Sequence, residues 1–301
     1  INDTNIPERH VDVPLVRRLL EDQLPQWSHL PLAEIASAGT DNAIFRLGTD
    51  MCVRLPRMAL AAGQVGKEQD WLPRFGQLPL DIPAPLAKGK ASEAYPWDWS
   101  VYTWIKGDVA TTNRIADMGE AATTLAAFIV ALRETVATGG PLSGPHNEYR
   151  GVDLALRDAV TRKSMEALRN EIDLPAVTEI WETALATPVW SGPPVWIHGD
   201  IHSGNLLARE GRLCAVIDFG LMGVGDPACD LMVGWNLLSA DAREPFRQQA
   251  HVDDATWARG RGWALSVALV ALAYYRTRND DLTQRSRHTI HEVLADIRSE
   301  G

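Results

Sequence analysis

The feature that most constrains this chain is a pair of short motifs in its second half, each placed after an apolar run. The motif H-G-D at 198–200 follows the apolar run 195–197, and Asn205 completes a D-x-x-x-x-N spacing. The motif D-F-G at 218–220 follows a second apolar run, 215–217. Short apolar runs bounded by turn residues are typical of buried strands. The pattern therefore predicts two buried strands, each ending in a loop that carries a carboxylate.

Asp200, Asn205 and Asp218 have the types and the order of residues that carry out phosphoryl transfer. The catalytic loop of protein kinases reads H-R-D-x-x-x-x-N and precedes D-F-G, and its Asp accepts the proton of the acceptor hydroxyl. We expect Asp200 to be this catalytic base. Asn205 and Asp218 are the expected ligands of Mg²⁺, which prefers oxygen ligands and neutralises charge on nucleotide phosphates.

Two histidines flank the predicted base and leave an alternative open. We expect His198 to bond loop backbone rather than carry a proton, and His202 to have an orienting or surface role. The string His198-x-Asp200-x-His202 is also compatible with a hydrolytic zinc or iron site, because imidazole and carboxylate bind both metals. That alternative leaves Asn205 and the D-F-G strand unexplained.

Composition limits the class of protein and of partner. The 301 residues are 46% hydrophobic and 23% charged, as in an ordinary globular protein with room for two lobes. The net charge of -10 argues against a nucleic-acid partner, since phosphate binding requires the opposite sign. No charged-then-apolar signal segment opens the chain, and no apolar run reaches membrane-spanning length. We therefore expect a cytoplasmic monomer without a membrane partner.

The first third of the chain has the pattern of a small lobe built on strands. A helix is expected over 13–24, and β-like runs cover 32–38, 43–47 and 51–55. The turn Gly39-Thr40-Asp41-Asn42 lies where a kinase nucleotide loop would be, but it has one Gly where the protein-kinase signature has three. Thr40 and Asn42 are candidate phosphate donors, and a simple hairpin turn is the alternative.

A basic and an acidic residue then occupy positions where kinases place an ion pair. Arg54 stands at the position of the Lys of V-A-I-K, and a helix expected over 63–75 carries Glu68. We expect the two to pair near the nucleotide, although Arg and Lys differ in geometry. An ordinary surface ion pair is the alternative.

The hinge between the lobes is expected at the end of an aromatic-rich strand over 97–105. The backbone of Thr103, Trp104 and Ile105 is there available to the edge of a purine. Apolar residues recur at helical spacing from residue 113 onward, and further helices are expected over 153–170, 174–186, 229–238, 255–277 and 284–300. The predicted fold class is α+β, a two-lobed protein-kinase-like fold. Its small N-lobe with an antiparallel sheet covers 1–106, and its larger, mostly helical C-lobe covers 107–301.

Two strings, W-I-H-G-D-I-H-S-G-N-L-L and V-I-D-F-G-L-M-G-V-G-D-P-A-C-D-L, resemble the aminoglycoside phosphotransferase superfamily of antibiotic kinases. The chain is similar in particular to the macrolide 2′-phosphotransferases, with supporting strings A-G-T-D-N-A-I-F-R-L, V-R-L-P-R and W-S-V-Y-T-W-I-K-G-D. The resemblance implies transfer of the γ-phosphate, typically of GTP, to the 2′-hydroxyl of a macrolide amino sugar. It also implies that Asp230 supports the catalytic loop. The alternative for Asp230 is an acidic residue favoured by the dipole at a helix start.

Two features indicate a small-molecule acceptor rather than a protein. Gly199 replaces the Arg of H-R-D, and Gly225-Asp226-Pro227 follows D-F-G without an A-P-E or room for an activation loop. The expected activity is an O-phosphotransferase acting on a macrolide in antibiotic resistance. An aminoglycoside or other small-metabolite kinase, using ATP or GTP, is the alternative, and a nucleotide-binding pseudokinase is a further one. Candidates for the acceptor pocket are Trp235-Asn236, the 144–150 loop and Tyr274-Tyr275, although aromatics on helices also form cores.

Overall fold

The computed structural model describes the backbone of residues 10–35 and 41–300, with side chains up to residue 298. The chain divides into two compact units. The first comprises Ile1–Gln77, Asp81–Gly107 and Ala215–Gly220, and the second Leu78–Leu80, Asp108–Cys214 and Leu221–Gly301. The sequence predicts one cut after residue 106, whereas the first unit also takes in the segment that carries D-F-G. Assignment of separate functions to the two lobes remains a proposal.

The first unit is built on a five-stranded antiparallel sheet, in the order β1-β2-β3-β5-β4. The strands predicted over 43–47, 51–55 and 97–105 are present, and β1 covers 32–35 of the strand predicted over 32–38, whose last residues lie outside the described part of the chain. Strand β4 is an edge strand, as a proline-containing segment requires. Their bounds are β1 (Leu32–Ile35), β2 (Asn42–Leu47), β3 (Met51–Pro56), β4 (Pro85–Gly89) and β5 (Trp99–Thr103).

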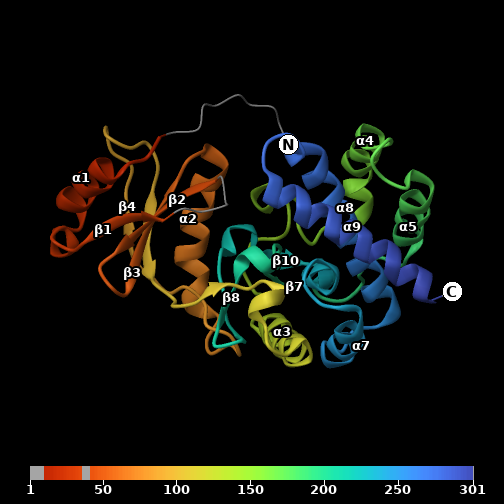
Figure 1. Cartoon of the computed structure of the whole chain (residues 1–301). Coiled ribbons are helices and arrows are strands. Elements are labelled where there is room, and N and C mark those ends of the chain that lie inside the picture. Colours follow the sequence, from red (N-terminus) through yellow and green to blue (C-terminus); the bar gives the residue numbers. More distant parts are fainter. Residues whose placement is uncertain (1–9, 36–40, 301) are drawn as a thin grey trace. The chain divides into compact units, whose positions relative to one another are not determined.

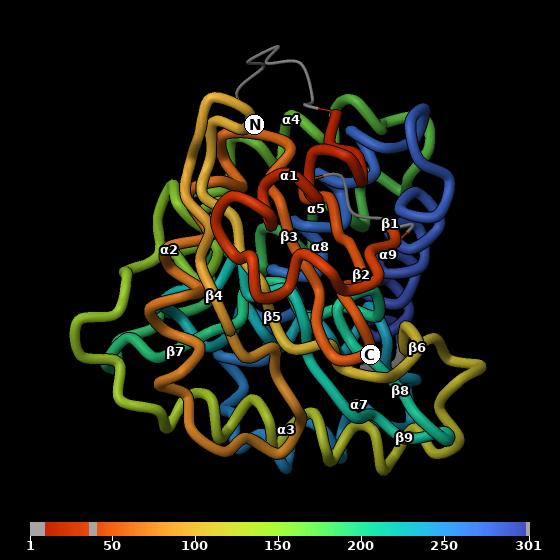
Figure 2. Tube along the Cα trace, turned by 90° about the vertical axis from the view of Figure 1, so that its left-hand side faces the viewer, coloured from red at the N-terminus to blue at the C-terminus, as the bar shows by residue number. Residues whose placement is uncertain are grey.

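Two helices, α1 (Val13–Gln23) and α2 (Ala59–Trp71), cover opposite faces of this sheet (Figure 1). Side chains alternate between the two faces of a strand. Val53 and Leu55 of β3 therefore join the apolar core beneath α1, while Arg54 between them faces α2. Figure 2 looks at the unit from the side of α1, which lies in front of the strands.

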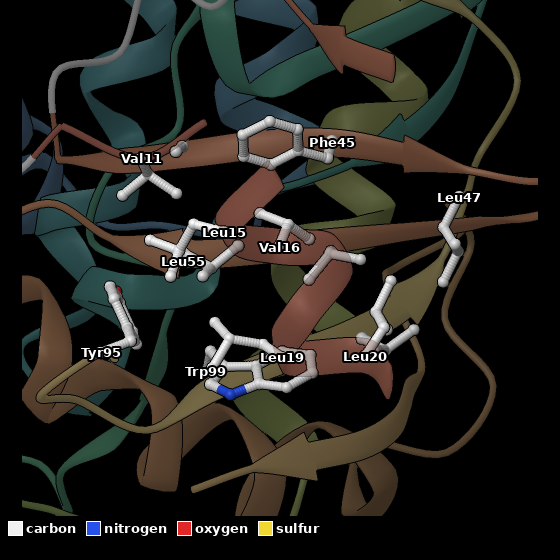
Figure 3. Packing of buried hydrophobic residues seen from close by; sticks show 13 residues of the cluster. Val11, Leu15, Val16, Leu19, Leu20, Phe45, Leu47, Leu55, Tyr95 and Trp99 are labelled. Atoms are coloured by element: carbon white, nitrogen blue, oxygen red, sulfur yellow. The ribbon is translucent and has the colours of Figure 1, made fainter. Parts of the chain in front are cut away.

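The core beneath α1 is fully apolar apart from the polar atoms of its aromatic residues (Figure 3). Helix α1 begins after Asp12, whose carboxylate accepts the backbone N–H of Leu15 at 2.9 Å. This cap satisfies one of the free amides of the first turn. The helix contributes Leu15, Val16, Leu19 and Leu20, and the strands and their connections contribute Phe45, Leu47, Leu55, Tyr95 and Trp99. Burial of this one face fixes the register of β2 and β3, because a one-residue slip would turn the apolar set outward.

The second unit is mainly helical. Helix α8 packs against α9, α5 and α4, and α8 and α9 run side by side (Figure 1). Helices lie at the other expected positions, but the helix expected over 229–238 is wrong, because Pro227–Met232 forms a 3-10 helix and only the four residues of α6 follow as α-helix. The sequence missed α7 because Pro245, a helix breaker, lies inside it. In the part of the chain that the structure describes, no helix is long and apolar enough to cross a membrane. The bounds are α3 (Met118–Glu134), α4 (Asp158–Ala167), α5 (Leu174–Ala186), α6 (Val233–Asn236), α7 (Ala240–Gln249), α8 (Asp254–Tyr275) and α9 (Asp280–Glu300).

Two small sheets of this unit frame the predicted catalytic loop. Strand β7 (Val195–Ile197) leads into the loop and pairs antiparallel with β10 (Gly223–Gly225). Strand β8 (Leu206–Arg209) leaves the loop and lies between β6 (Asp108–Val109) and β9 (Arg212–Val216). The sequence predicted β7 and the end of β9, but β6 and β10 are too short to give a pattern. The loop is thus held at both ends by strand pairing.

Candidate active site

Asp200 lies at the end of β7 in the second unit, with polar side chains on both sides of its carboxylate. The amide nitrogen of Asn205 donates to the Asp200 backbone oxygen and to Oδ2, both at 3.0 Å. His202 Nε2 lies 3.4 Å from Oδ2, and Arg150 Nη2 lies 3.5 Å from Oδ1. The structure thus brings the predicted base and the predicted ligand Asn205 together, and adds Arg150.

The charge state of Asp200 follows from these neighbours. Burial raises the pKa of Asp200, but its interactions with His202, Arg150 and His198 outweigh burial and hold it well below its usual value. Asp200 is therefore ionised at neutral pH. An ionised carboxylate can accept the hydrogen bond, and then the proton, of a hydroxyl group.

Asp230 accepts hydrogen bonds from the backbone of the catalytic loop. Its two carboxylate oxygens accept the backbone N–H groups of His198 and Gly199, each at 2.7 Å. The side chain is fully buried, and burial raises the pKa of Asp230 to about 6 against the lowering effect of these hydrogen bonds and of Arg133. Asp230 therefore satisfies two buried amides that no regular secondary structure would pair.

Gly199 is required by the backbone of the loop. Its φ is +82°, and a Cβ at this position would lie 2.5 Å from the carbonyl oxygen of Leu221. Any other residue would be strained and would clash. The steric limits of the loop thus require glycine at position 199. The fact that this position is not the Arg of H-R-D is therefore not independent evidence for a small acceptor.

Both histidines of the loop accept hydrogen bonds from backbone N–H groups. His198 is buried and its Nδ1 accepts the N–H of Asp200 at 3.2 Å, while Nδ1 of His202 accepts the N–H of Gly204 at 3.0 Å. Within residues 10–35 and 41–298, no group of three or more His, Cys, Asp or Glu side chains is placed to hold a metal ion. The described residues therefore do not assemble the ligand set of a hydrolytic zinc or iron site.

Arg54, Glu68 and Asp218 form a second polar group, in the first unit. Arg54 Nη1 lies 2.7 Å from both carboxylate oxygens of Glu68, and Nη2 lies 2.7 Å from Oδ1 of Asp218. Burial lowers the pKa of the Arg54 guanidinium, but Glu68 and Asp218 outweigh burial and raise it above its usual value. Asn42 joins this group when its amide oxygen faces the guanidinium, where it accepts from Nη2 at 2.9 Å.

Tyr102 completes this group, and the sequence reasoning missed it. Its hydroxyl donates to Oε2 of Glu68 at 2.7 Å, and the ring is buried. On β5, Ser100 pairs with Arg54 and Tyr102 pairs with Cys52. The two-residue alternation of strands thus places Tyr102 on the same face as Arg54. That alternation was the signal that could have identified it.

The D-F-G segment presents the carboxylate of Asp218. Asp218 has a φ of +64°, a left-handed conformation that Asp adopts more readily than most residues, and its side chain is 48% exposed. Phe219 is buried beside Phe75, with ring centroids 6.0 Å apart. A Cβ at Gly220 would lie 2.3 Å from Oε1 of Gln64, so the D-F-G segment passes close to α2 at this residue.

The hinge residues differ in what their backbone can offer. Thr103 and Trp104 already donate their N–H groups, to the carbonyl oxygens of Ala84 and Asp50 at 2.9 Å and 2.7 Å. Ile105 is therefore the remaining N–H donor of the three predicted positions. Thr40, the other predicted nucleotide contact, lies outside the described residues.

The residues expected near the acceptor have different surroundings. Trp235 is fully buried and donates to Asp296, so it is a core residue. Asn236 donates to the carbonyl oxygen of Ile201 at 3.0 Å and so supports the catalytic loop. Tyr274 is 42% exposed and packs edge-on against Tyr275. The 144–150 loop contributes Arg150 beside Asp200.

Each unit has a side-chain oxygen of the kind that magnesium prefers. Asn205 uses its amide nitrogen on Asp200, which leaves Oδ1 for a cation, and Asp218 offers an exposed carboxylate. Magnesium is commonly bound by one or two protein oxygens together with substrate phosphates, rather than by an all-protein cage.

Comparison with known proteins shows the family of this chain. The chain matches the phosphotransferase enzyme family over residues 33–263. An aminoglycoside 3'-phosphotransferase from Escherichia coli is 37% identical over 71 residues, which are 24% of this chain and 26% of that protein. The chain thus spans about a quarter of the length of the curated relatives it matches.

Solved structures share the fold over nearly the whole chain. The GDP and kanamycin complex of APH(2")-IIia has a TM-score of 0.71 at 20% identity, covering 93% of this chain and 98% of that one. Macrolide 2'-phosphotransferase MphH from Brachybacterium faecium has a TM-score of 0.59 at 21% identity, covering 93% and 97%. These similarities confirm the predicted kinase-like fold class, with its antiparallel-sheet unit and its helical unit.

Proposed function

Since this chain belongs to the phosphotransferase enzyme family, we propose that it transfers the γ-phosphate of a nucleoside triphosphate to a hydroxyl of a small molecule. Asp200 is the observation that carries the proposal. It is an ionised carboxylate that follows the end of a strand. Asp230 accepts backbone N–H groups of its loop, and Asn205 donates to its Oδ2. Such a carboxylate can orient the acceptor hydroxyl in line with the γ-phosphate and take its proton.

The other polar residues act on the nucleotide in this proposal. Asp218 and Oδ1 of Asn205 hold Mg²⁺, which supplies neutralisation of the charge on the phosphates. Arg54, held by Glu68, contacts the phosphates, with Thr40 and Asn42 as further donors. Because Arg54 is paired with Asp218 in the structure, nucleotide binding requires Asp218 to exchange this partner. The N–H of Ile105 contacts the purine edge.

We propose a macrolide as the acceptor, phosphorylated at the 2′-hydroxyl of its amino sugar, with GTP as donor. The resemblance of the hinge and catalytic strings to macrolide 2′-phosphotransferases supports this choice. A macrolide 2'-phosphotransferase shares the fold, but so does an aminoglycoside phosphotransferase crystallised with GDP and kanamycin. An aminoglycoside kinase is therefore the second candidate. The net charge of -10 suits a cationic acceptor of either kind.

The test is a parallel assay of acceptors and donors. Purified protein is incubated with Mg²⁺ and either GTP or ATP, and with either an erythromycin-type or a kanamycin-type acceptor. We expect phosphorylated erythromycin with GTP as the better donor. Turnover of kanamycin without turnover of any macrolide would overturn the macrolide assignment and establish the second candidate. Nucleotide binding without turnover of any acceptor would indicate a pseudokinase instead.

A further inference from the structure

Arg150 is a buried arginine whose charge is incompletely paired. Arg150 is 8% exposed. Its Nη2 lies 3.5 Å from Oδ1 of Asp200, which is the distance of an ion pair rather than of a short hydrogen bond. Its Nε and Nη1 are buried and have no hydrogen-bond partner among the residues that the structure describes. An arginine keeps its charge at all physiological pH values. Burial of such a cation with unsatisfied donors is unfavourable, so stability gives no reason for an arginine here.

The backbone around Arg150 fixes it firmly to the strand that carries the catalytic loop. Asn147 accepts the Arg150 N–H and donates to the Arg150 carbonyl oxygen, both at 3.0 Å. Gly151 follows with a φ of +73°, and a Cβ there would lie 2.4 Å from Cδ1 of Ile197, the last residue of β7. The Gly151 carbonyl oxygen also accepts the N–H of Asp226 at 2.8 Å. Arg150 and Asp200 are therefore held on one rigid scaffold.

The backbone directly before Arg150 is in a strained conformation. Glu148 and Tyr149, directly before Arg150, are consecutive non-glycine residues with φ values of 52° and 59°. Left-handed conformations are unfavourable for such residues and persist only where the surrounding structure enforces them. The turn is closed by the Tyr149 N–H, which donates to the Gly144 carbonyl oxygen at 2.8 Å.

Arg150 also packs against the position at which protein kinases carry an arginine. A Cβ at Gly199 would lie 3.1 Å from Cβ of Arg150. In the H-R-D motif the residue before the catalytic Asp is Arg. Here that position is an obligatory glycine, and a guanidinium from a separate loop reaches the Asp instead.

We propose that Arg150 is a positioning residue for phosphoryl transfer. Its guanidinium restrains Asp200 from the Oδ1 side, while Asn205 restrains it from the Oδ2 side. Together they set the angle at which the carboxylate meets the acceptor hydroxyl. In the reaction the acceptor oxygen bonds to the γ-phosphorus, the bond to the β-phosphate oxygen breaks, and the hydroxyl proton passes to Asp200. Arg150 keeps all of its protons, and the inference rests on the proposed function.

A positioning role predicts a loss in kcat without a loss in substrate binding. We expect Arg150→Ala to lower kcat by about 10–100-fold and to change both KM values by less than about threefold, because a misplaced base slows the chemical step alone. Guanidinium chloride at non-denaturing concentration should restore part of the lost rate. Arg150→Lys should have an intermediate kcat, since an ammonium keeps the charge but not the planar fork.

Arg162→Ala is the matched control, because Arg162 pairs with Asp158 and Glu182 on the surface of the same unit. It should keep the wild-type kcat and show no response to guanidinium. A thermal melt of each variant separates loss of rate from loss of fold, and Arg150→Lys carries the test if the alanine variant does not fold.

Three results would overturn the inference. An unchanged kcat in both Arg150 variants would do so, and so would a raised acceptor KM with kcat retained, which would place Arg150 against the substrate. Absence of turnover by the wild-type protein would overturn the proposed function together with the inference. Wild-type turnover with an unchanged kcat in both Arg150 variants, or with a raised acceptor KM alone, would overturn the inference but leave the proposed function standing.

Discussion

Three carboxylates of this chain differ in their surroundings, and the differences suit them to different tasks. Asp230 is buried and its carboxylate accepts two backbone amides of the loop, so it supports structure. The pKa of Asp200 is held low by its interactions with His202, Arg150 and His198, which suits the proposed base. Asp218 is half exposed and pairs with Arg54, so its carboxylate is accessible to a cation. Environment rather than residue type distinguishes the three.

Gly199 gives a sharp test of the loop geometry. We expect Gly199→Ala to lower the free energy of unfolding by about 2 kcal/mol or more and to reduce kcat, because the new Cβ would meet the Leu221 oxygen at a positive φ. Gly63→Ala is the matched control, since Gly63 lies inside α2 with nothing within 4 Å of a Cβ. It should stabilise the protein by about 0.5–1 kcal/mol in denaturant titration. Equal effects of the two substitutions would contradict the loop geometry.

Tyr102 tests the group around Arg54. Tyr102→Phe removes the hydroxyl that donates to Glu68, so we expect the free energy of unfolding to fall by about 1–2 kcal/mol. The KM for nucleotide should rise, because Glu68 holds Arg54. The exposed Tyr274 provides the control, and Tyr274→Phe should change stability by less than about 0.5 kcal/mol. A Tyr102→Phe protein with wild-type stability and nucleotide KM would exclude this role.

Among the elements, those with a long periodic pattern were predictable and short or irregular ones were not. The pattern of α5 identified it at its full length, and H-G-D and D-F-G located their loops at the ends of β7 and β9. Pro245 concealed α7, and β10 is three residues long. Arg150 lies on an irregular loop, where no periodicity places a side chain relative to Asp200. Periodicity reports which face an element buries, but not which loops meet.

Glu171, in the turn between α4 and α5, pairs with arginines of two other helices of the second unit and gives a pH-dependent prediction. Its carboxylate contacts Arg287 of α9 at 2.6 Å and Arg276 at the end of α8, and both lower the pKa of Glu171. A carboxylate with a depressed pKa stabilises the fold above its unfolded pKa, about 4.3, and loses this effect as the pH falls through its folded pKa.

The substitution Glu171→Gln should therefore destabilise the protein at pH 7, but by less than about 1 kcal/mol, because the site is solvent-exposed and screened. The difference from wild type should disappear in strong acid, as measured by denaturant titration at a series of pH values. The surface pair of Arg169 and Glu166 does not join two helices, so loss of that pair is the control to which the effect of Glu171→Gln is compared. A Glu171→Gln deficit that persists unchanged in strong acid would refute the ion-pair explanation.

Across the whole molecule, the residues proposed to act on one nucleotide belong to different units. Arg54, Glu68 and Asp218 lie in the first unit, whereas Asp200 and Asn205 lie in the second. The proposal therefore requires that Asp218→Asn and Asn205→Ala each weaken the dependence of activity on Mg²⁺. A ligand that binds only the folded protein stabilises it, by about 2.7 kcal/mol at a hundredfold excess over Kd. Melting temperatures with Mg²⁺ and GTP, and again after EDTA, measure this linkage for each variant.

The most direct test of the central claim is Mg²⁺-dependent transfer of the γ-phosphate to the acceptor by wild-type protein and by Asp200→Asn. Mass spectrometry of the acceptor and quantification of the released nucleoside diphosphate give the two products independently. We predict one phosphate added per diphosphate released, and a rate roughly 10²–10⁴-fold lower for Asp200→Asn with GTP binding retained. An Asp200→Asn protein that phosphorylates the acceptor at the wild-type rate would contradict the account.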